Sequence, residues 1–379
     1  MKRALIVANL AGFASFLIND ILILQDLGYQ IDFAANGLKF PWGETKEKLD
    51  KLNVSFLQID FNSKHPFAKE NFSAYRQLQN LILKNHYDLI HCHTPIAGLI
   101  TRLAARKIHK NGVKVLYTTH GFAFHSKTSK KTWLIYYSME KFASHFCDAM
   151  ITINHEDFDN AKKMHCKNVF YIHGVGVNVK KYHDVEIDRA AYRKSIGVPE
   201  GQIMILSIGE LSDRKNHKVI VDAVGGMSDK NRYTYVVCGA GIEGDTGKQL
   251  EQRAKEKGVN LQLLGFRTDI PQIIACSDIG AIPSKREGLG WAGIQSLGGG
   301  VPLVGSNVQG IREYVVDGKT GYLCDPNDSI AFAKAISRLA QRNEKEKEDQ
   351  KEECYKMALK FDISISREEI RKIYNQILE

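Results

Sequence analysis

Short apolar runs alternate with amphipathic helical patterns along the first half of the chain. The runs that predict strands cover residues 4–8, 30–35, 54–59, 88–93, 114–119 and 149–154. Strands separated by segments of helical length are typical of a parallel sheet that helices cover on its faces. The first half is therefore predicted to be a doubly wound α/β domain.

The second half repeats this alternation, with apolar runs at 203–209, 233–241, 261–266, 279–284 and 301–306. A charged stretch follows the glycines near residue 176, so we predict two Rossmann-like domains, 1–178 and 179–365. Ser366 and Glu369 have the spacing of a capping box, which predicts a final amphipathic helix from Ser366 to Leu378. In open α/β sheets ligands bind beyond the carboxyl ends of the strands, so the residues just after each strand are the first candidates for a site in a cleft.

The composition fits a folded two-domain protein of 379 residues, 44% of them apolar. Seven scattered cysteines form no C-x-x-C pair, which indicates free thiols in a reducing compartment. The basic and apolar N-terminus could be taken for a signal peptide, but Asn9 and Gly12 interrupt it. No run approaches the ~18 apolar residues of a membrane span. We expect a soluble cytoplasmic protein.

The net charge of +9 belongs to the first half of the chain. Residues 1–180 hold 23 Lys/Arg and 14 Asp/Glu, whereas residues 181–379 hold 29 of each. A basic face attracts polyanions such as nucleic acid, an anionic bilayer or phosphorylated substrates, and the alternative is a simple contribution to solubility.

Two segments after predicted strands carry candidate chemistry. Residues 209–217 (GELSDRKNH) place Arg214 and Lys215 beside the start of a helix, a good environment for a diphosphate. Residues 284–295 (SKREGLGWAGIQ) form a glycine-rich turn in which backbone amides can approach a ligand and Glu287 could accept sugar hydroxyls. The alternatives are a basic surface turn and a purely structural glycine turn.

With these motifs the chain resembles the GT-B fold retaining glycosyltransferases of family 4, especially the bacterial capsular and exopolysaccharide members. The resemblance covers essentially the whole chain, at residues 91–95, 117–122, 151–163, 173–178, 209–217, 265–270, 283–290 and 302–315. It implies two Rossmann-like domains facing across a cleft, the first binding the acceptor and the second the nucleotide sugar. It also implies that the last helix, 366–379, crosses back to the first domain.

The resemblance assigns roles to individual residues. In the second domain, Arg214 and Lys215 match the pair that neutralises the donor diphosphate, and Glu287 matches the first Glu of the E-x7-E motif, which faces the donor sugar. The remaining donor contacts that it implies are Gly209, Gly265, Phe266, Arg267, Gly288, Leu289 and Gly290. In the first domain, His120 matches the histidine that approaches the transferred sugar, and Gly12 lies in the loop that closes over the donor phosphates. The expected catalytic residues are thus His120, Glu287, Arg214 and Lys215.

The chain departs from the family at Gln295, which stands where the second Glu of the motif usually accepts from both ribose hydroxyls. An amide offers one acceptor and one donor group in place of two acceptor oxygens, so we expect ribose to be held less strongly. The cationic pair and helix amides can stabilise the leaving diphosphate as a metal does elsewhere. We therefore expect no metal and no cofactor beyond the nucleotide-sugar substrate.

Three other patterns suggest different chemistry and carry less weight. Residues 239–244 fit G-x-G-x-x-G, but the acidic residue of a dinucleotide site is missing about 20 positions later. Asp157 and Asp159 fit the D-x-D of metal-dependent transferases, but they lie in a helical pattern whose charges are expected to face solvent. His91 and His93 share one face of a strand, yet no third metal ligand is evident nearby, so we expect a packed or acceptor-side pair.

Residues 125–142 place basic residues beside aromatic ones, which suits an anionic bilayer interface. The expected acceptor and membrane-side residues are His93, Lys127, Lys130, Lys131, Trp133 and Tyr136. The same pattern could bind RNA, although no RNA-binding motif accompanies it, or could be an ordinary amphipathic helix. We expect no nucleic-acid partner.

The leading hypothesis is a retaining, metal-independent hexosyltransferase at the inner leaflet of the cytoplasmic membrane. Its donor would be a nucleotide sugar, by resemblance UDP-linked, and its acceptor a polyprenyl-diphosphate-linked glycan of surface polysaccharide synthesis. The alternatives are a GT-B nucleotide-sugar epimerase or hydrolase, which needs no lipid acceptor, and a donor-binding subunit with little activity.

Overall fold

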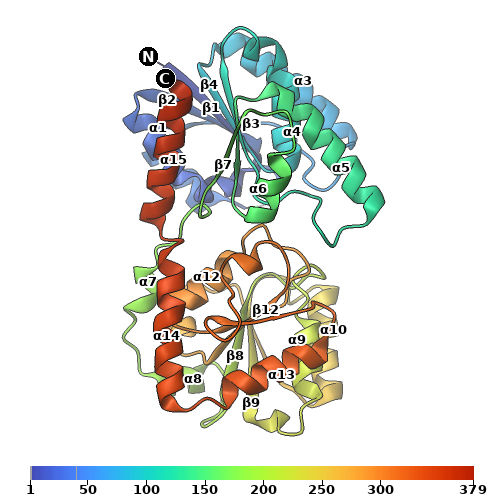
Figure 1. Cartoon of the computed structure of the whole chain (residues 1–379), viewed down its shortest axis with the longest axis vertical. Coiled ribbons are helices and arrows are strands. Elements are labelled where there is room, and N and C mark those ends of the chain that lie inside the picture. The colour runs from blue at the N-terminus through green and yellow to red at the C-terminus, as the bar shows by residue number, and fades with distance from the viewer. Residues whose placement is uncertain (1, 40) are drawn as a thin grey trace. The chain divides into compact units, whose positions relative to one another are not determined.

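The computed structural model describes residues 2–39 and 41–379 and separates into two compact units (Figure 1). The first unit holds the chain up to Val175 together with Ser364–Glu379, and the second holds Gly176–Ile363. Each unit is built around its own parallel sheet, and both are described separately below.

The first unit contains a seven-stranded sheet in the order β3-β2-β1-β4-β5-β6-β7, in which every pairing is parallel. Its strands are β1 (Lys2–Leu10), β2 (Tyr29–Asn36), β3 (Ser55–Gln58), β4 (Leu89–His93), β5 (Lys114–Thr118), β6 (Ala149–Thr152) and β7 (Asn168–Tyr171). Its helices are α1 (Ile18–Asp26), α2 (Gly43–Lys51), α3 (Lys69–Asn85), α4 (Pro95–His109), α5 (Lys130–Ala143), α6 (His155–Ala161) and α15 (Ile363–Leu378).

The second unit contains a six-stranded parallel sheet in the order β10-β9-β8-β11-β12-β13. Its strands are β8 (Ile203–Ile208), β9 (Tyr233–Cys238), β10 (Asn260–Gly265), β11 (Ile279–Ile282), β12 (Leu303–Ser306) and β13 (Gly321–Cys324). Its helices are α7 (Lys180–His183), α8 (Arg189–Ser195), α9 (Lys218–Gly225), α10 (Asp245–Lys257), α11 (Ile270–Ala275), α12 (Trp291–Gly298), α13 (Ser329–Ala340) and α14 (Glu344–Leu359).

The central strands of both sheets are buried on both faces, which explains why they read as continuous apolar runs in the sequence. Residues 4–8 of β1 are all 0% exposed, and every residue of β9 is buried. The doubly wound α/β prediction is therefore confirmed for both halves of the chain. Among the described strands of the second sheet, only the edge strand β13 was not predicted.

The C-terminal helix differs from its prediction at the first turn. Helix α15 begins at Ile363, and Ser366 lies inside it with its hydroxyl donating to the carbonyl of Gly174 at 2.7 Å. Glu369 accepts from the backbone and ring nitrogens of His173 instead of capping the helix. The predicted capping box was wrong, because both side chains bind the chain segment after β7.

Glycines 298–300 allow close packing at the end of α12. A Cβ on Gly299 would lie 2.4 Å from the side chain of Ile274, and one on Gly300 would lie 2.3 Å from Lys351 of α14. Gly300 also has a φ of +74°, which favours glycine. The triple glycine therefore ends the helix and brings α12 against α11 and α14.

Candidate active site

The strongest candidate site lies at the carboxyl edge of the second sheet, between β8 and β11. These strands are neighbours, but the chain leaves β8 toward β9 on one side and continues from β11 toward β12 on the other. Such a reversal of strand order opens a crevice in which open α/β sheets bind ligands. The segment 209–217 follows β8 and the segment 283–290 follows β11, so both candidate motifs meet at this crevice.

Glu287 is the centre of the site and is only 8% exposed. Its Oε1 accepts from Lys215 Nζ at 2.7 Å, from Ser284 Oγ at 2.8 Å and from Arg214 Nη1 at 3.1 Å. Burial alone would raise the pKa of Glu287, but the two cations and the hydrogen bonds hold it below its ordinary value. The carboxylate is therefore ionised near neutral pH and fixes both cations in place.

The two cations differ in their access to solvent. The side chain of Lys215 is 16% exposed and that of Arg214 is 39% exposed. Arg214 also binds Glu210, which is itself 55% exposed, at 3.1 Å. An incoming anion can compete with Glu210 for Arg214 at little cost because exposed ion pairs are weak. The arrangement is suited to bind a diphosphate.

Two glycines keep the crevice open beside these cations. A Cβ on Gly209 would lie 2.9 Å from the Lys215 side chain. Gly290, immediately before α12, has a φ of +84°, and a Cβ there would lie 2.9 Å from the Tyr314 hydroxyl. A larger residue at Gly209 would displace Lys215, and one at Gly290 would strain the turn.

The loop after β10 lies two strands away from β8, a distance of about 10 Å at the usual strand spacing. Gly265 ends β10, and the ring of Phe266 is 81% exposed. Arg267 is held by Asp269 through contacts of 2.8 and 2.5 Å. The exposed ring of Phe266 is thus placed where it could stack on a planar group.

Gln295 lies on α12 and is partly buried. Burial raises the pKa of Tyr182, and a hydrogen bond with Gln295 partly opposes that rise. The amide therefore already has one contact within the protein. Leu289 lies in the turn directly before α12 and is only 3% exposed. Gly288 and Gly290 flank it in this turn.

The histidines of the first unit form a second polar cluster at the ends of β4 and β5. His93 Nδ1 lies 3.2 Å from Nε2 of His120, and the ring of His91 lies 4.1 Å from that of His93. Phe13, next to Gly12 after β1, packs edge-on against His120 at 4.8 Å. Burial lowers the pKa of His120 to about 3, so its ring is neutral at physiological pH.

The expectation of no third candidate ligand near His91 and His93 was wrong. Asp20 of α1 is buried there, and one ligand atom from each of the three residues lies within 4.8 Å of the others. Both ring nitrogens of His91 have hydrogen-bond partners, the hydroxyls of Tyr374 and Thr118. No local pattern points to Asp20 or Tyr374, because they come from opposite ends of the chain.

Asp157 is buried, so the expectation that it faces solvent was wrong. Its Oδ2 accepts from the backbone of Phe122 at 3.0 Å and from Asn154 Nδ2 at 2.9 Å. Burial, the largest cause, raises the pKa of Asp157 to about 7. Through its hydrogen bond with the backbone of Phe122, the Asp157 carboxyl stabilises the turn after β5.

This raised pKa predicts a pH-dependent effect of Asp157→Asn. The unfolded chain loses the Asp157 proton near pH 4 and the folded chain near pH 7, so the carboxyl stabilises the fold at low pH and that contribution is lost as the pH rises through 7. Asparagine cannot ionise and can still accept both hydrogen bonds. We expect the free energy of unfolding of the variant, relative to that of the wild type, to rise by a few kcal/mol between pH 4 and pH 8, measured by urea unfolding. A difference that is constant with pH would contradict this assignment.

The residues expected at a membrane lie on or just before α5. Lys127, Lys130 and Lys131 are exposed at its start. Trp133 stacks on Tyr137 at 4.4 Å, and Trp133 and Tyr136 are half-buried against the core of the first unit. The apolar side chains of α5 that reach solvent are instead Leu134, Ile135 and Phe142, which are 61%, 43% and 59% exposed.

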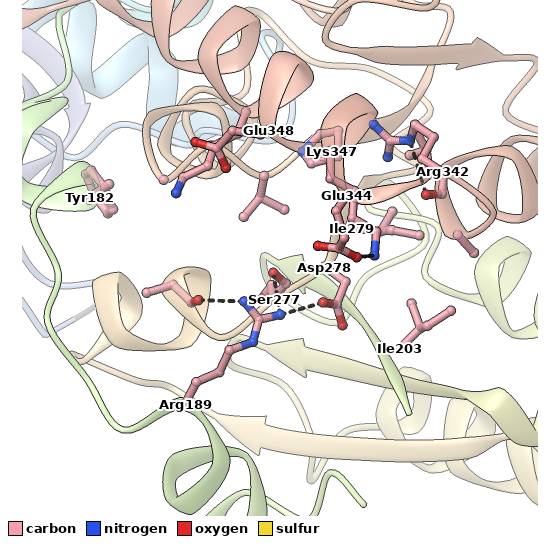
Figure 2. A pocket seen from close by; sticks show the side chains of 18 of the residues that line it. Tyr182, Arg189, Ile203, Ser277, Asp278, Ile279, Arg342, Glu344, Lys347 and Glu348 are labelled. Atoms are coloured by element: carbon pink, nitrogen blue, oxygen red, sulfur yellow. Dashed lines mark hydrogen bonds and ion pairs between the residues drawn. The ribbon is translucent and has the colours of Figure 1, made fainter. Parts of the chain in front are cut away.

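Another cavity of the second unit, of about 390 Å³, lies at the opposite edge of the same sheet (Figure 2). It is lined by Ile203 and Ile279, the first residues of β8 and β11, and by charged side chains of α14. Figure 2 shows Arg189 joined to Ser277 and Asp278 at its floor. This cavity lies at the amino ends of β8 and β11, whereas the crevice at Glu287 lies beyond their carboxyl ends.

Comparison with known proteins identifies the class of this chain. Residues 188–357 match the family model described as glycosyl transferases group 1, and residues 23–181 match the model described as glycosyltransferase family 4. EpsD of Bacillus subtilis (strain 168), a protein provisionally named as a glycosyltransferase, is 32% identical over 94% of this chain and 91% of its own length. The chain is a glycosyltransferase of the GT-B type and belongs to family 4.

Two further similarities are informative. The UDP-Gal:alpha-D-GlcNAc-diphosphoundecaprenol alpha-1,3-galactosyltransferase of Escherichia coli is 29% identical over 69% of this chain and 68% of its own length. The structure of Anabaena HepE in complex with UDP and glucose superposes with a TM-score of 0.79, at 19% identity, over 99% of this chain and 100% of that one. The latter similarity establishes the fold.

Proposed function

We propose that this enzyme transfers a hexose from a UDP-linked donor to a lipid-linked glycan, with retention of configuration and without a metal cofactor. The observation that carries the proposal is the Lys215–Glu287–Arg214 cluster at the switch point of the second sheet. The name of the E. coli relative, which specifies UDP-Gal and a diphosphoundecaprenol acceptor, supports the choice of both substrates.

The cluster can supply the chemistry that sugar transfer needs. Departure of a nucleoside diphosphate from the anomeric carbon builds negative charge on the leaving phosphate oxygen. Lys215 and Arg214 would face that charge, and Glu287 with Ser284 holds Lys215 in place before the reaction. Cations that need no reorganisation stabilise a transition state most effectively. Phe266, exposed about two strand spacings away, would stack on the base.

His120 is suited to contact the transferred sugar and not the leaving diphosphate. Its low pKa makes it a neutral hydrogen-bonding group and a weak base. A neutral ring can approach a sugar carbon that develops positive charge, whereas an imidazolium would repel it. We therefore assign His120 to stabilise the developing sugar cation and not to remove a proton from the acceptor.

The donor assignment is tested by thermal unfolding with UDP, GDP, ADP and NAD, each with and without magnesium. A ligand that binds only the native state raises the unfolding temperature, by roughly 5–10 °C for one unit of this size at a hundredfold excess over its Kd. We expect UDP to act selectively and independently of magnesium in the wild type, and to have little effect on Lys215→Ala. A response to NAD alone, or one that requires magnesium, would contradict the proposal.

We also propose that the first unit binds the surface of an anionic membrane through the face made by α3, α4 and α5. An apolar groove of about 640 Å³ lies on this face, lined among others by Phe67, Phe72, Leu103 and Phe142. The three phenylalanines are 59–68% exposed. Lys130 and Lys131, at the start of α5, are exposed as well. Exposed aromatic side chains together with cations on the same unit suit the bilayer interface. Among the described residues, none of the helices is long and apolar enough to cross a membrane.

The membrane proposal predicts that Phe72→Ser with Phe142→Ser weakens vesicle binding at least tenfold, because two apolar side chains no longer enter the interface. Sedimentation with phosphatidylglycerol-containing vesicles measures this directly. The control is Ile330→Ser in the second unit, where Ile330 is 67% exposed. Wild-type binding by the double variant, or equal binding to neutral vesicles, would refute the proposal.

A further inference from the structure

Tyr374 on α15 connects elements of the first unit that lie far apart in the sequence. Its ring is fully buried. Its hydroxyl donates to Asp20 Oδ1 of α1 at 3.0 Å and lies 2.7 Å from Nδ1 of His91 on β4. The other ring nitrogen of His91 lies 2.8 Å from Oγ1 of Thr118 on β5. Four side chains therefore form one buried chain of hydrogen bonds.

Counting protons along this chain fixes the state of His91. Burial raises the pKa of Asp20 to about 7. Above that pH the carboxylate can only accept, so the single hydroxyl proton of Tyr374 is donated to Asp20 and Tyr374 can only accept from His91. His91 must then carry its proton on Nδ1, and its Nε2 accepts from the Thr118 hydroxyl. The ring is neutral, because burial and the neighbouring His120 lower the pKa of His91 to about 3.

His91 in turn supports the two histidines at the strand ends. His91 and His93 share one face of β4, with ring centroids 4.1 Å apart, and His93 Nδ1 lies 3.2 Å from His120 Nε2. His93 Nε2 is buried and has no hydrogen-bond partner among residues 2–39 and 41–379. A buried nitrogen without a partner is unfavourable, and an oxygen atom of a bound ligand would satisfy it.

We propose that Tyr374 is a positioning residue, which fixes the tautomer and ring orientation of His91 and thereby holds His93 and His120. His93 Nε2, which is buried and lacks a partner among the described residues, would then be satisfied by a hydroxyl or phosphate oxygen of the acceptor. The acceptor part of this inference rests on the function proposed above, whereas the positioning part does not. The C-terminal helix is thus part of the machinery of the first unit, in addition to covering its sheet.

The positioning part is tested by NMR of the histidine ring nitrogens in the full-length protein. At pH 8, above the pKa of Asp20, we expect the wild type to carry the His91 proton on Nδ1. Tyr374→Phe keeps the ring and removes the hydroxyl that accepts from Nδ1, which leaves Asp20 Oδ1, 3.7 Å away, as the other acceptor on that side. The His91 ring should therefore turn toward Asp20 or move its proton to Nε2 with Thr118 as acceptor, and in either case the nitrogen signals of His91, His93 and His120 should move.

The control variant for this experiment is Arg371→Ala on the same helix. Arg371 contacts Asp26 at 2.6 Å, and both side chains are substantially exposed. This change loosens α15 without touching His91, so the histidine signals should stay in place. An Nε2-protonated His91 in the wild type, or unchanged histidine signals in Tyr374→Phe, would overturn the proposal.

Kinetics separate this role from a merely structural one. Tyr374→Phe should lower kcat about tenfold or more and leave the KM for the nucleotide sugar unchanged, and Arg371→Ala should match the wild type. Wild-type kcat in Tyr374→Phe would refute a role in the reaction even if the tautomer changes. If the wild type transfers no sugar, the function proposed above fails, and the NMR result alone decides whether Tyr374 positions His91.

Discussion

Lys215→Ala is expected to lower kcat/KM for sugar transfer by 10²–10³-fold, the usual cost of removing one preorganised group that faces developing negative charge. Lys215 is the less exposed of the two cations and makes the shortest contact with Glu287, at 2.7 Å. Its loss removes one of the two cations that meet at Glu287 Oε1. Steady-state kinetics with a fixed acceptor concentration measure the effect.

Lys218→Ala provides a matched control for this experiment. Lys218 lies three residues further on, is 52% exposed and forms a long ion pair with Asp213 at 3.8 Å. The same change of charge there should leave the rate within about twofold of the wild type, since exposed pairs contribute little. Equal losses in both variants would show that overall charge matters and that the Lys215 geometry does not.

Glu140→Gln is expected to destabilise the first unit by about 3–5 kcal/mol, because it leaves a buried arginine without its counter-ion. Arg102 of α4 is 0% exposed, and its Nη2 binds Glu140 of α5 at 2.6 Å. The Arg102 guanidinium also lies 3.9 Å from the ring centroid of Tyr117. The unfolding temperature of the unit should fall by roughly 10 °C in calorimetry.

A second variant identifies the cause of this loss. Arg102→Met combined with Glu140→Leu removes both charges from the α4–α5 contact, and we expect it to recover most of the stability. Lys356→Ala, which breaks an exposed pair with Glu352, should change little. A double variant as unstable as Glu140→Gln would show that packing, and not an unpaired charge, explains the effect.

The sequence predicted the fold well because the signals for it are local. Each buried strand of both sheets is an apolar run, and the donor motifs follow β8 and β11 directly. Strand β13 was missed because residues 321–324 (GYLC) form a four-residue run that begins with glycine. At this length the strand depends on its pairing with β12, which no local pattern reveals.

The contacts between distant segments could not be predicted in the same way. Asp157 was predicted to be exposed because its neighbours in the sequence are charged. It is instead buried and accepts a hydrogen bond from the backbone of Phe122. Ser366 had the spacing of a helix cap but binds Gly174. The network of Asp20, His91 and Tyr374 joins residues up to 354 positions apart. Such contacts follow from the tertiary fold and not from spacing.

The measurement that tests the central claim most directly is UDP release from a UDP-sugar in the presence and absence of a polyprenyl-diphosphate-linked sugar in vesicles. We predict that release depends on the acceptor, that a glycolipid product larger by one sugar forms in equal amount, and that Lys215→Ala abolishes both. Release of UDP at the same rate without the acceptor would instead show hydrolysis, and transfer by Lys215→Ala at the wild-type rate would contradict the assigned site.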